Sequence, residues 1–123
     1  QAAVGFTYMA LDGRFLRVNR KFCDIVGYSQ SELLQRTCQA ITHPEDLEPN
    51  LSCVRQLLMV DRDSYSMDKR YIHQLGELVW TEVTYSLVRN ETGGPLWIVA
   101  VVRDIGERKC MGEKLRKRES KDR

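Results

Sequence analysis

The chain has 123 residues, of which 42% are hydrophobic and 29% are charged, and its formal net charge is +2. This length and composition indicate one globular domain and exclude a disordered or fibrous chain. Eight Lys or Arg and four Asp or Glu fall in residues 107–123, so residues 1–106 carry a net charge of −2. That balance argues against a nucleic-acid-binding surface on the globular part.

The four cysteines, Cys23, Cys38, Cys53 and Cys110, show no Cys-x-x-Cys spacing. We therefore expect reduced, mostly buried thiols in a cytosolic protein, and no zinc site. The first residues lack a basic flank followed by an apolar run, so no signal peptide is predicted. Because the chain does not begin with Met, we interpret it as a segment of a longer protein.

Two strands are predicted at residues 5–11 and 14–18, because Asp12-Gly13 between them is a typical hairpin turn. Short helices are predicted next. Asn19 is expected to cap the first of them at its N-terminus, and Gly27 is expected to end it.

Two capping patterns divide the following stretch. Ser29 followed by Glu32 is a capping box that predicts a second helix. The residues from Thr42 repeat the pattern, which predicts a short helical turn ending near Pro49. Asn50 is then expected to cap a third helix, whose apolar residues recur at helical spacing.

Three strands are predicted in the remainder, at residues 65–73, 79–87 and 96–105. Short loops join them, which indicates an antiparallel meander. Together with the first hairpin, they predict an α+β fold: a five-stranded antiparallel sheet with short helices on one face and a C-terminal helix. The last strand is apolar on both faces and needs cover on both, by this domain's helices and by a further helix, domain or second copy.

Several short motifs occur in an order that is typical of one protein family. They are Asp12-Gly13, Asn19, Phe22, Gly27-Tyr28-Ser29, Glu32-Leu33, His43-Pro44-Glu45-Asp46, Gly76, Trp80, Asp104-Ile105 and Glu107-Arg108. In this order the chain resembles a PAS domain with its C-terminal PAC portion, over about residues 4–109. One departure is Gly106, which stands where the family most often has Thr or Ser.

The resemblance implies a non-enzymatic sensory and dimerising module of a multidomain bacterial signalling protein, of the histidine kinase or cyclic-di-GMP type. Residues 1–106 would form the sensor domain, and residues 107–123 a charged linker helix that leads to an effector domain. The expected partners are a second copy of the chain, that effector domain in cis and a small-molecule ligand. Neither nucleic acid nor membrane insertion is expected.

A ligand pocket is expected between the inner face of the sheet and the helices. The candidate wall residues are Phe22, Ile25, Val54, Arg55, Leu58, Tyr71, Val83 and Tyr85, with Arg55 or Tyr85 as polar anchors. The alternative is that these side chains simply fill a closely packed core. No cofactor is identified.

Two cofactors common in the resembled family are not expected. The helix before the third strand contains no His that could bind heme iron. Cys53 lies outside the Asn-Cys-Arg-Phe-Leu-Gln motif of flavin photosensors. His43 and His73 are expected to stabilise turns or to face solvent.

The resemblance implies that the signal is coupled at the end of the last strand, where Asp104 would join the sheet to the output helix. A helix cap is an equal interpretation of Asp104. The coupling candidates are Trp80, Asp104, Ile105 and Arg108, and the candidates for a dimer interface on the outer sheet face are Leu96, Trp97 and Ile98.

Two alternatives remain open. One is a dimerisation scaffold of the same family with a filled core and no ligand. The other is a small cone-shaped α+β isomerase that would use a carboxylate in an apolar pocket, for which Glu82 and Asp68 are the candidates.

Overall fold

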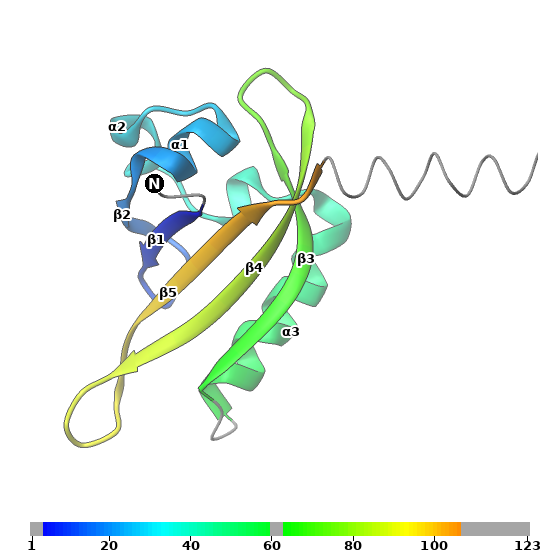
Figure 1. Cartoon of the computed structure of the whole chain (residues 1–123). Helices are drawn as coiled ribbons and strands as arrows, with labels where there is room; N and C mark the ends of the chain where they lie inside the picture. Colours follow the sequence, from blue (N-terminus) through cyan, green and yellow to red (C-terminus); the bar gives the residue numbers. More distant parts are fainter. Residues whose placement is uncertain (1–3, 60–62, 107–123) are drawn as a thin grey trace, which may run out of the picture.

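Five antiparallel strands form one sheet in the order β2-β1-β5-β4-β3 in the computed structural model, which describes residues 4–59 and 63–106 (Figure 1). The strands are β1 (Gly5–Met9), β2 (Phe15–Val18), β3 (Ser64–Ile72), β4 (Leu78–Arg89) and β5 (Pro95–Asp104). The last three strands pair in sequence order, and β5 also pairs with β1. The predicted α+β fold with its antiparallel meander is therefore confirmed. The predicted C-terminal helix lies outside the described residues.

Four helical segments connect the first hairpin to the meander. They are α1 (Arg20–Val26), α2 (Gln30–Leu33), the 3₁₀ turn η1 (Gln39–Ile41) and α3 (Pro44–Met59). Asn19 caps α1 as predicted, since its Oδ1 accepts the backbone N–H of Phe22 at 3.0 Å. The same oxygen accepts the N–H of Phe6 in β1 at 2.9 Å, so this cap also joins the helix to the sheet. The capping box of Ser29 and Glu32 is confirmed.

Residues 44–59 form one continuous helix, so the prediction of a turn ending near Pro49 and a new helix capped by Asn50 was wrong. Pro49 lacks an N–H and so removes one intrahelical hydrogen bond. Burial of Cys53 and Leu57 along the same helix stabilises the uninterrupted arrangement. Asn50 consequently lies inside the helix, with its side chain free to bond elsewhere.

Alternation along the central strands sets which side chains face the helices. In β4, Thr81, Val83 and Tyr85 are buried, and the strand positions between them are only half-buried. In β5, Ile98 and Ala100 are buried in the same way. Ile98 therefore belongs to the core, and its assignment to the outer sheet face was wrong because the inward phase of β5 begins at this residue.

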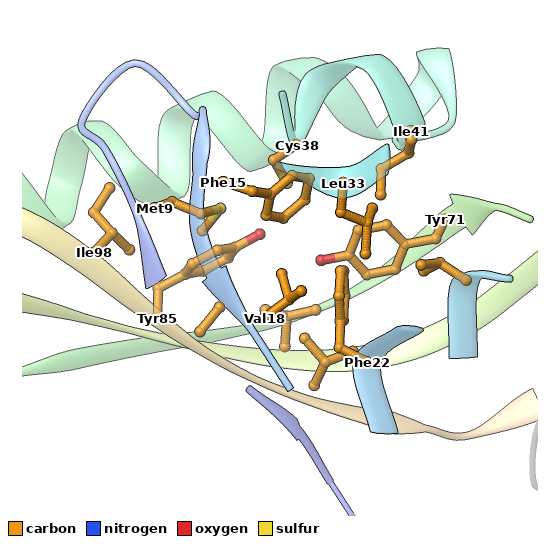
Figure 2. Close-up of a cluster of buried hydrophobic side chains, with 14 of the residues drawn as sticks. Met9, Phe15, Val18, Phe22, Leu33, Cys38, Ile41, Tyr71, Tyr85 and Ile98 are labelled. Carbon is orange, nitrogen blue, oxygen red and sulfur yellow. The ribbon is translucent and has the colours of Figure 1, made fainter. Parts of the chain in front are cut away.

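Aromatic side chains hold the core between the sheet and the helices together. The ring of Phe22 lies 5.6 Å from that of Phe15 and 5.5 Å from that of Tyr71, centroid to centroid. Figure 2 shows the hydroxyl ends of Tyr71 and Tyr85 pointing toward each other within this cluster. Both tyrosines are almost fully buried, so each hydroxyl needs a polar partner inside the fold.

Candidate functional site

A cavity of about 270 Å³ lies where the first half of α3 faces the sheet. Its apolar wall comprises Met9, Ala10, Leu11, Gly13, Leu47, Leu51, Val54 and Ile98. Its polar wall comprises Cys38, Gln39, Glu48, Asn50 and Tyr85. Gln39 and Glu48 are exposed, whereas Cys38 and Tyr85 are buried, so the cavity has an open mouth and a polar inner end.

Lys69 of β3 lies behind this inner end and is fully buried. Its Nζ donates hydrogen bonds to Asn50 Oδ1 at 2.8 Å, to Tyr85 Oη at 3.1 Å and to Cys38 Sγ at 3.2 Å. The same ammonium group lies 4.5 Å from the centroid of the Tyr71 ring, in a cation–π contact. All three hydrogen-bond acceptors belong to residues that line the cavity.

None of the described hydrogen-bond partners of Lys69 is a carboxylate. Within residues 4–59 and 63–106, no carboxylate oxygen lies within 4.0 Å of its Nζ. Burial raises the pKa of the Tyr71 and Tyr85 hydroxyls well above their usual value, and the neighbouring Cys38 thiol contributes in the same direction. Tyr85 is therefore a neutral phenol that accepts from Lys69 and donates to Asn50 Oδ1.

Asn50 presents its amide nitrogen as an unused donor. Its Oδ1 already accepts from both Lys69 and Tyr85. In the part of the chain that the structure describes, Nδ2 of Asn50 has no hydrogen-bond partner. Because Asn50 lines the cavity, a ligand acceptor there would find these N–H groups available.

Sequence reasoning missed Lys69 altogether and interpreted Asn50 as a helix cap. One signal was present in the sequence. Met67, Lys69 and Tyr71 alternate along β3 and share its inward face, which places a lysine between a half-buried residue packed against the core and a core residue.

The predicted pocket residues fall into two groups. Val54 and Tyr85 line the cavity. The others do not line it: Phe22, Ile25, Tyr71 and Val83 are buried in the core, Leu58 is half-buried and Arg55 is exposed. The role of all eight in binding stays a prediction.

The predicted coupling residues meet at the end of β5. The backbone N–H of Ile105 donates to the carbonyl of Trp80 at 3.0 Å, and the Ile105 side chain is buried. Asp104 Oδ1 accepts the N–H of Gly106 at 2.9 Å. Its role as a helix cap stays a prediction, because residues 107–123 lie outside the described residues. The guanidinium of Arg70 lies 4.9 Å from the Trp80 ring centroid. Arg108 lies outside the described residues.

The three residues predicted for a dimer interface on the outer sheet face differ in their exposure. Leu96 is exposed and Trp97 is half-buried, whereas Ile98 lies in the core. On the neighbouring strand β1, Phe6 and Tyr8 are also exposed, so the outer face of the sheet carries apolar side chains on two adjacent strands.

The remaining candidates for chemistry lie away from the cavity. Glu82 is half-buried on the outer phase of β4 and bonds Arg103 at 3.4 Å, and Asp68 is exposed. Nδ1 of His43 and Nδ1 of His73 each accept a backbone N–H two residues along the chain, so both imidazoles stabilise turns. Among the described residues, no group of three His, Cys, Asp or Glu is placed to hold a metal ion. In those same ranges, no helix is long and apolar enough to cross a membrane.

Comparison with curated proteins identifies relatives in signalling enzymes. Over 108 residues the chain is 40% identical to the probable diguanylate cyclase DgcE of Escherichia coli, which is 88% of this chain and 10% of DgcE. Over 114 residues it is 26% identical to the sensor histidine kinase TmoS of Ectopseudomonas mendocina, which is 93% of this chain and 12% of TmoS. The chain thus spans about a tenth of the length of these relatives.

Solved structures share the fold. A PAS domain from Colwellia psychrerythraea superimposes with a TM-score of 0.79 at 19% identity, covering 86% of this chain and 89% of that one. A sensory box histidine kinase/response regulator from Burkholderia thailandensis gives 0.77 at 22% identity, covering 98% and 90%. The family model for the PAS fold matches residues 15–102. This match, together with the shared topology, shows that the chain belongs to the PAS domain family.

Proposed function

We propose that this PAS domain is a cytoplasmic, non-enzymatic sensor within a longer bacterial signalling protein whose output domain is a diguanylate cyclase or a histidine kinase. The identity to DgcE, a probable diguanylate cyclase, favours the first kind of output. The weaker similarity to TmoS, a sensor histidine kinase, supports the second. A domain of about a tenth of the length of either protein leaves the output to other parts of the full-length chain.

The observation that carries the sensory role is the cavity of about 270 Å³ with a buried polar cluster at its inner end. Ligand sites in proteins are typically concave and mostly apolar, with a few polar groups that fix orientation. Here Asn50 and Tyr85 provide these groups, and Lys69 holds both of them in place.

The same strands connect the cavity to the end of the sheet. Tyr85 lines the cavity from β4, and Trp80, earlier on that strand, holds Ile105 through its backbone carbonyl. A ligand that repacks Asn50 and Tyr85 would alter the β4–β5 pairing and thereby the direction of the chain after Ile105. Such a ligand shifts the output only by its differential affinity for the two arrangements.

Native mass spectrometry of the purified domain, with a denatured control and an absorption spectrum, tests the sensory proposal. We expect additional mass that is lost on denaturation, or ligand-dependent mass after addition of cell extract metabolites. Val54→Phe, which enlarges a side chain of the cavity wall, should abolish that added mass. Arg55→Phe at a neighbouring exposed position should leave the added mass unchanged. The proposal would be contradicted if the native mass of the wild-type domain equals that of the chain alone, both as purified and after addition of the metabolites.

A second candidate function, a ligand-free dimerisation scaffold, is favoured by the apolar side chains of the outer sheet face. Phe6 and Tyr8 are 41% and 38% exposed, and the half-buried Trp97 lies on the adjacent strand β5. Sedimentation of the wild-type domain and of Tyr8→Lys would test it. A dimer that is lost in Tyr8→Lys, together with an empty cavity, would favour the scaffold.

A further inference from the structure

We propose that the cavity binds a small monocarboxylic acid, with its carboxylate at the end formed by Asn50, Tyr85 and Lys69 and its apolar body toward α3 and β1. This inference rests on the proposed ligand-sensing function and names the chemical class of the ligand. It starts from Lys69, a buried cation that no carboxylate of the described residues neutralises.

Burying a charge is costly unless it is paired and hydrogen-bonded. Lys69 has hydrogen bonds to three acceptors, none of them a carboxylate, and a contact with the Tyr71 ring, which compensate the lost hydration in part. An anion at the inner end of the cavity would supply the missing opposite charge. Since one lysine provides one positive charge, a monoanion matches it better than a phosphate or a dicarboxylate.

The geometry places such an anion within reach of that charge. Asn50, Tyr85 and Cys38 each bond Nζ of Lys69 and also line the cavity, so a group that touches them is one side chain away from the ammonium. The unused N–H groups of Asn50 Nδ2 are the direct donors for a carboxylate oxygen. At the mouth the exposed carboxylate of Glu48 repels an anion, which favours the orientation with the acid group inward.

The rest of the cavity selects an apolar body. Met9, Leu47, Leu51, Val54 and Ile98 form its wall. A cavity of roughly 150 Å³ is enough to hold benzene, and this one measures about 270 Å³. A single ring or a short saturated chain bearing one carboxylate therefore fits, whereas a large polycyclic cofactor does not.

The test compares acids with their neutral amides by NMR titration of the isotope-labelled protein. The probes are hexanoate against hexanamide and phenylacetate against phenylacetamide, which differ in charge but hardly in size. We expect each acid to bind at least about tenfold more tightly than its amide, because a buried opposite charge favours the ionised form. The resonances that shift should include Asn50 and residues of the apolar wall.

Two variants eliminate the unpaired positive charge of Lys69 in different ways. Lys69→Met deletes the cation at similar length, and Asn50→Asp supplies an internal carboxylate to pair with Lys69. Both should reduce the preference for acids to about twofold or less, and Asn50→Asp keeps the test valid if Lys69→Met fails to fold. Lys21→Met is the matched control, because α1 does not line the cavity, and it should retain the full preference.

The outcomes separate this inference from the proposed function. Equal binding of acid and amide, or a preference that persists in both charge variants, would overturn the carboxylate assignment and leave ligand sensing standing. Absence of shifts at cavity resonances with both pairs would also overturn it. Native mass spectrometry then decides independently whether the cavity binds another class of ligand.

Discussion

Arg70 and Asp46 tie the first turn of α3 to strand β3 through three hydrogen bonds. Nη2 of Arg70 lies 2.8 Å from Asp46 Oδ1, while Nε and the backbone N–H of Arg70 reach Oδ2 at 3.1 and 2.7 Å. The guanidinium group also lies over the Trp80 ring, 4.9 Å from its centroid. One planar side chain thereby connects the helix that borders the cavity with the strand that holds Ile105.

Replacing Asp46 with Ala should destabilise the domain by about 2–3 kcal/mol. The change removes three charge-assisted hydrogen bonds and leaves the mostly buried Arg70 without its main partner. Urea unfolding at neutral pH measures the loss. Glu45→Ala is the control, because Glu45 is exposed and contacts Arg70 only at 3.3 Å, and it should cost less than about 0.5 kcal/mol. Equal losses in the two variants would contradict this account.

The same ion pair should make stability depend on pH in the acid range. Hydrogen bonds from the Arg70 side chain, with smaller contributions from its backbone N–H and its charge, hold the pKa of Asp46 below its usual range. A lowered folded-state pKa stabilises the fold above the unfolded-state value of about 3.9. That stabilisation is lost as the pH falls through the folded-state pKa.

We therefore expect the stability difference between wild type and Asp46→Asn to be full at about pH 6 and to shrink steadily toward about pH 2. Urea titrations at a series of pH values measure this difference directly. The exposed carboxylates, including Asp12 and Glu32 with their own lowered pKa values, are present in both proteins and cancel. A difference that is constant across the range would show that Asp46 acts through packing alone.

Local signals in the sequence were sufficient for most of the fold. Asn19 and Ser29 cap helices as predicted, because a cap depends on residues only three positions away. In β4, local alternation also matches the burial, because Thr81, Val83 and Tyr85 are buried and the positions between them are half-buried. Pro49 misled the prediction, because the packing that keeps α3 continuous comes from contacts with the sheet, which lies far away in sequence.

The candidate site was harder to predict, since it is assembled from distant segments. Asn50, Lys69 and Tyr85 are separated by 19 and 16 residues and meet only when α3 packs across β3 and β4. Ile98 was assigned to the outer sheet face, although it lies in the core. Its strand is apolar on both faces, so composition alone could not assign its phase, and the register with β4 decides it.

Asp104→Ala should loosen the exit from the sheet. Oδ1 of Asp104 holds the N–H of Gly106, and losing a cap of this kind costs about 1 kcal/mol. Hydrogen exchange at the Gly106 amide should therefore accelerate roughly fivefold. Asp104→Asn keeps an acceptor at the same place and should exchange nearly as slowly as wild type. Equal protection in the Ala variant would exclude the capping role.

Thr7→Val should leave stability unchanged or raise it by up to about 1 kcal/mol, because the fully buried Thr7 Oγ1 has no hydrogen-bond partner among the described residues. Thr81→Val is the matched comparison. Thr81 is equally buried, but its hydroxyl donates to the backbone carbonyl of Lys69 at 2.9 Å. Thr81→Val should lower the stability of the domain by about 1 kcal/mol, since it leaves the buried Lys69 carbonyl without that donor. Thermal unfolding of both variants measures the contrast, and a larger loss at Thr7 than at Thr81 would reverse the assignment.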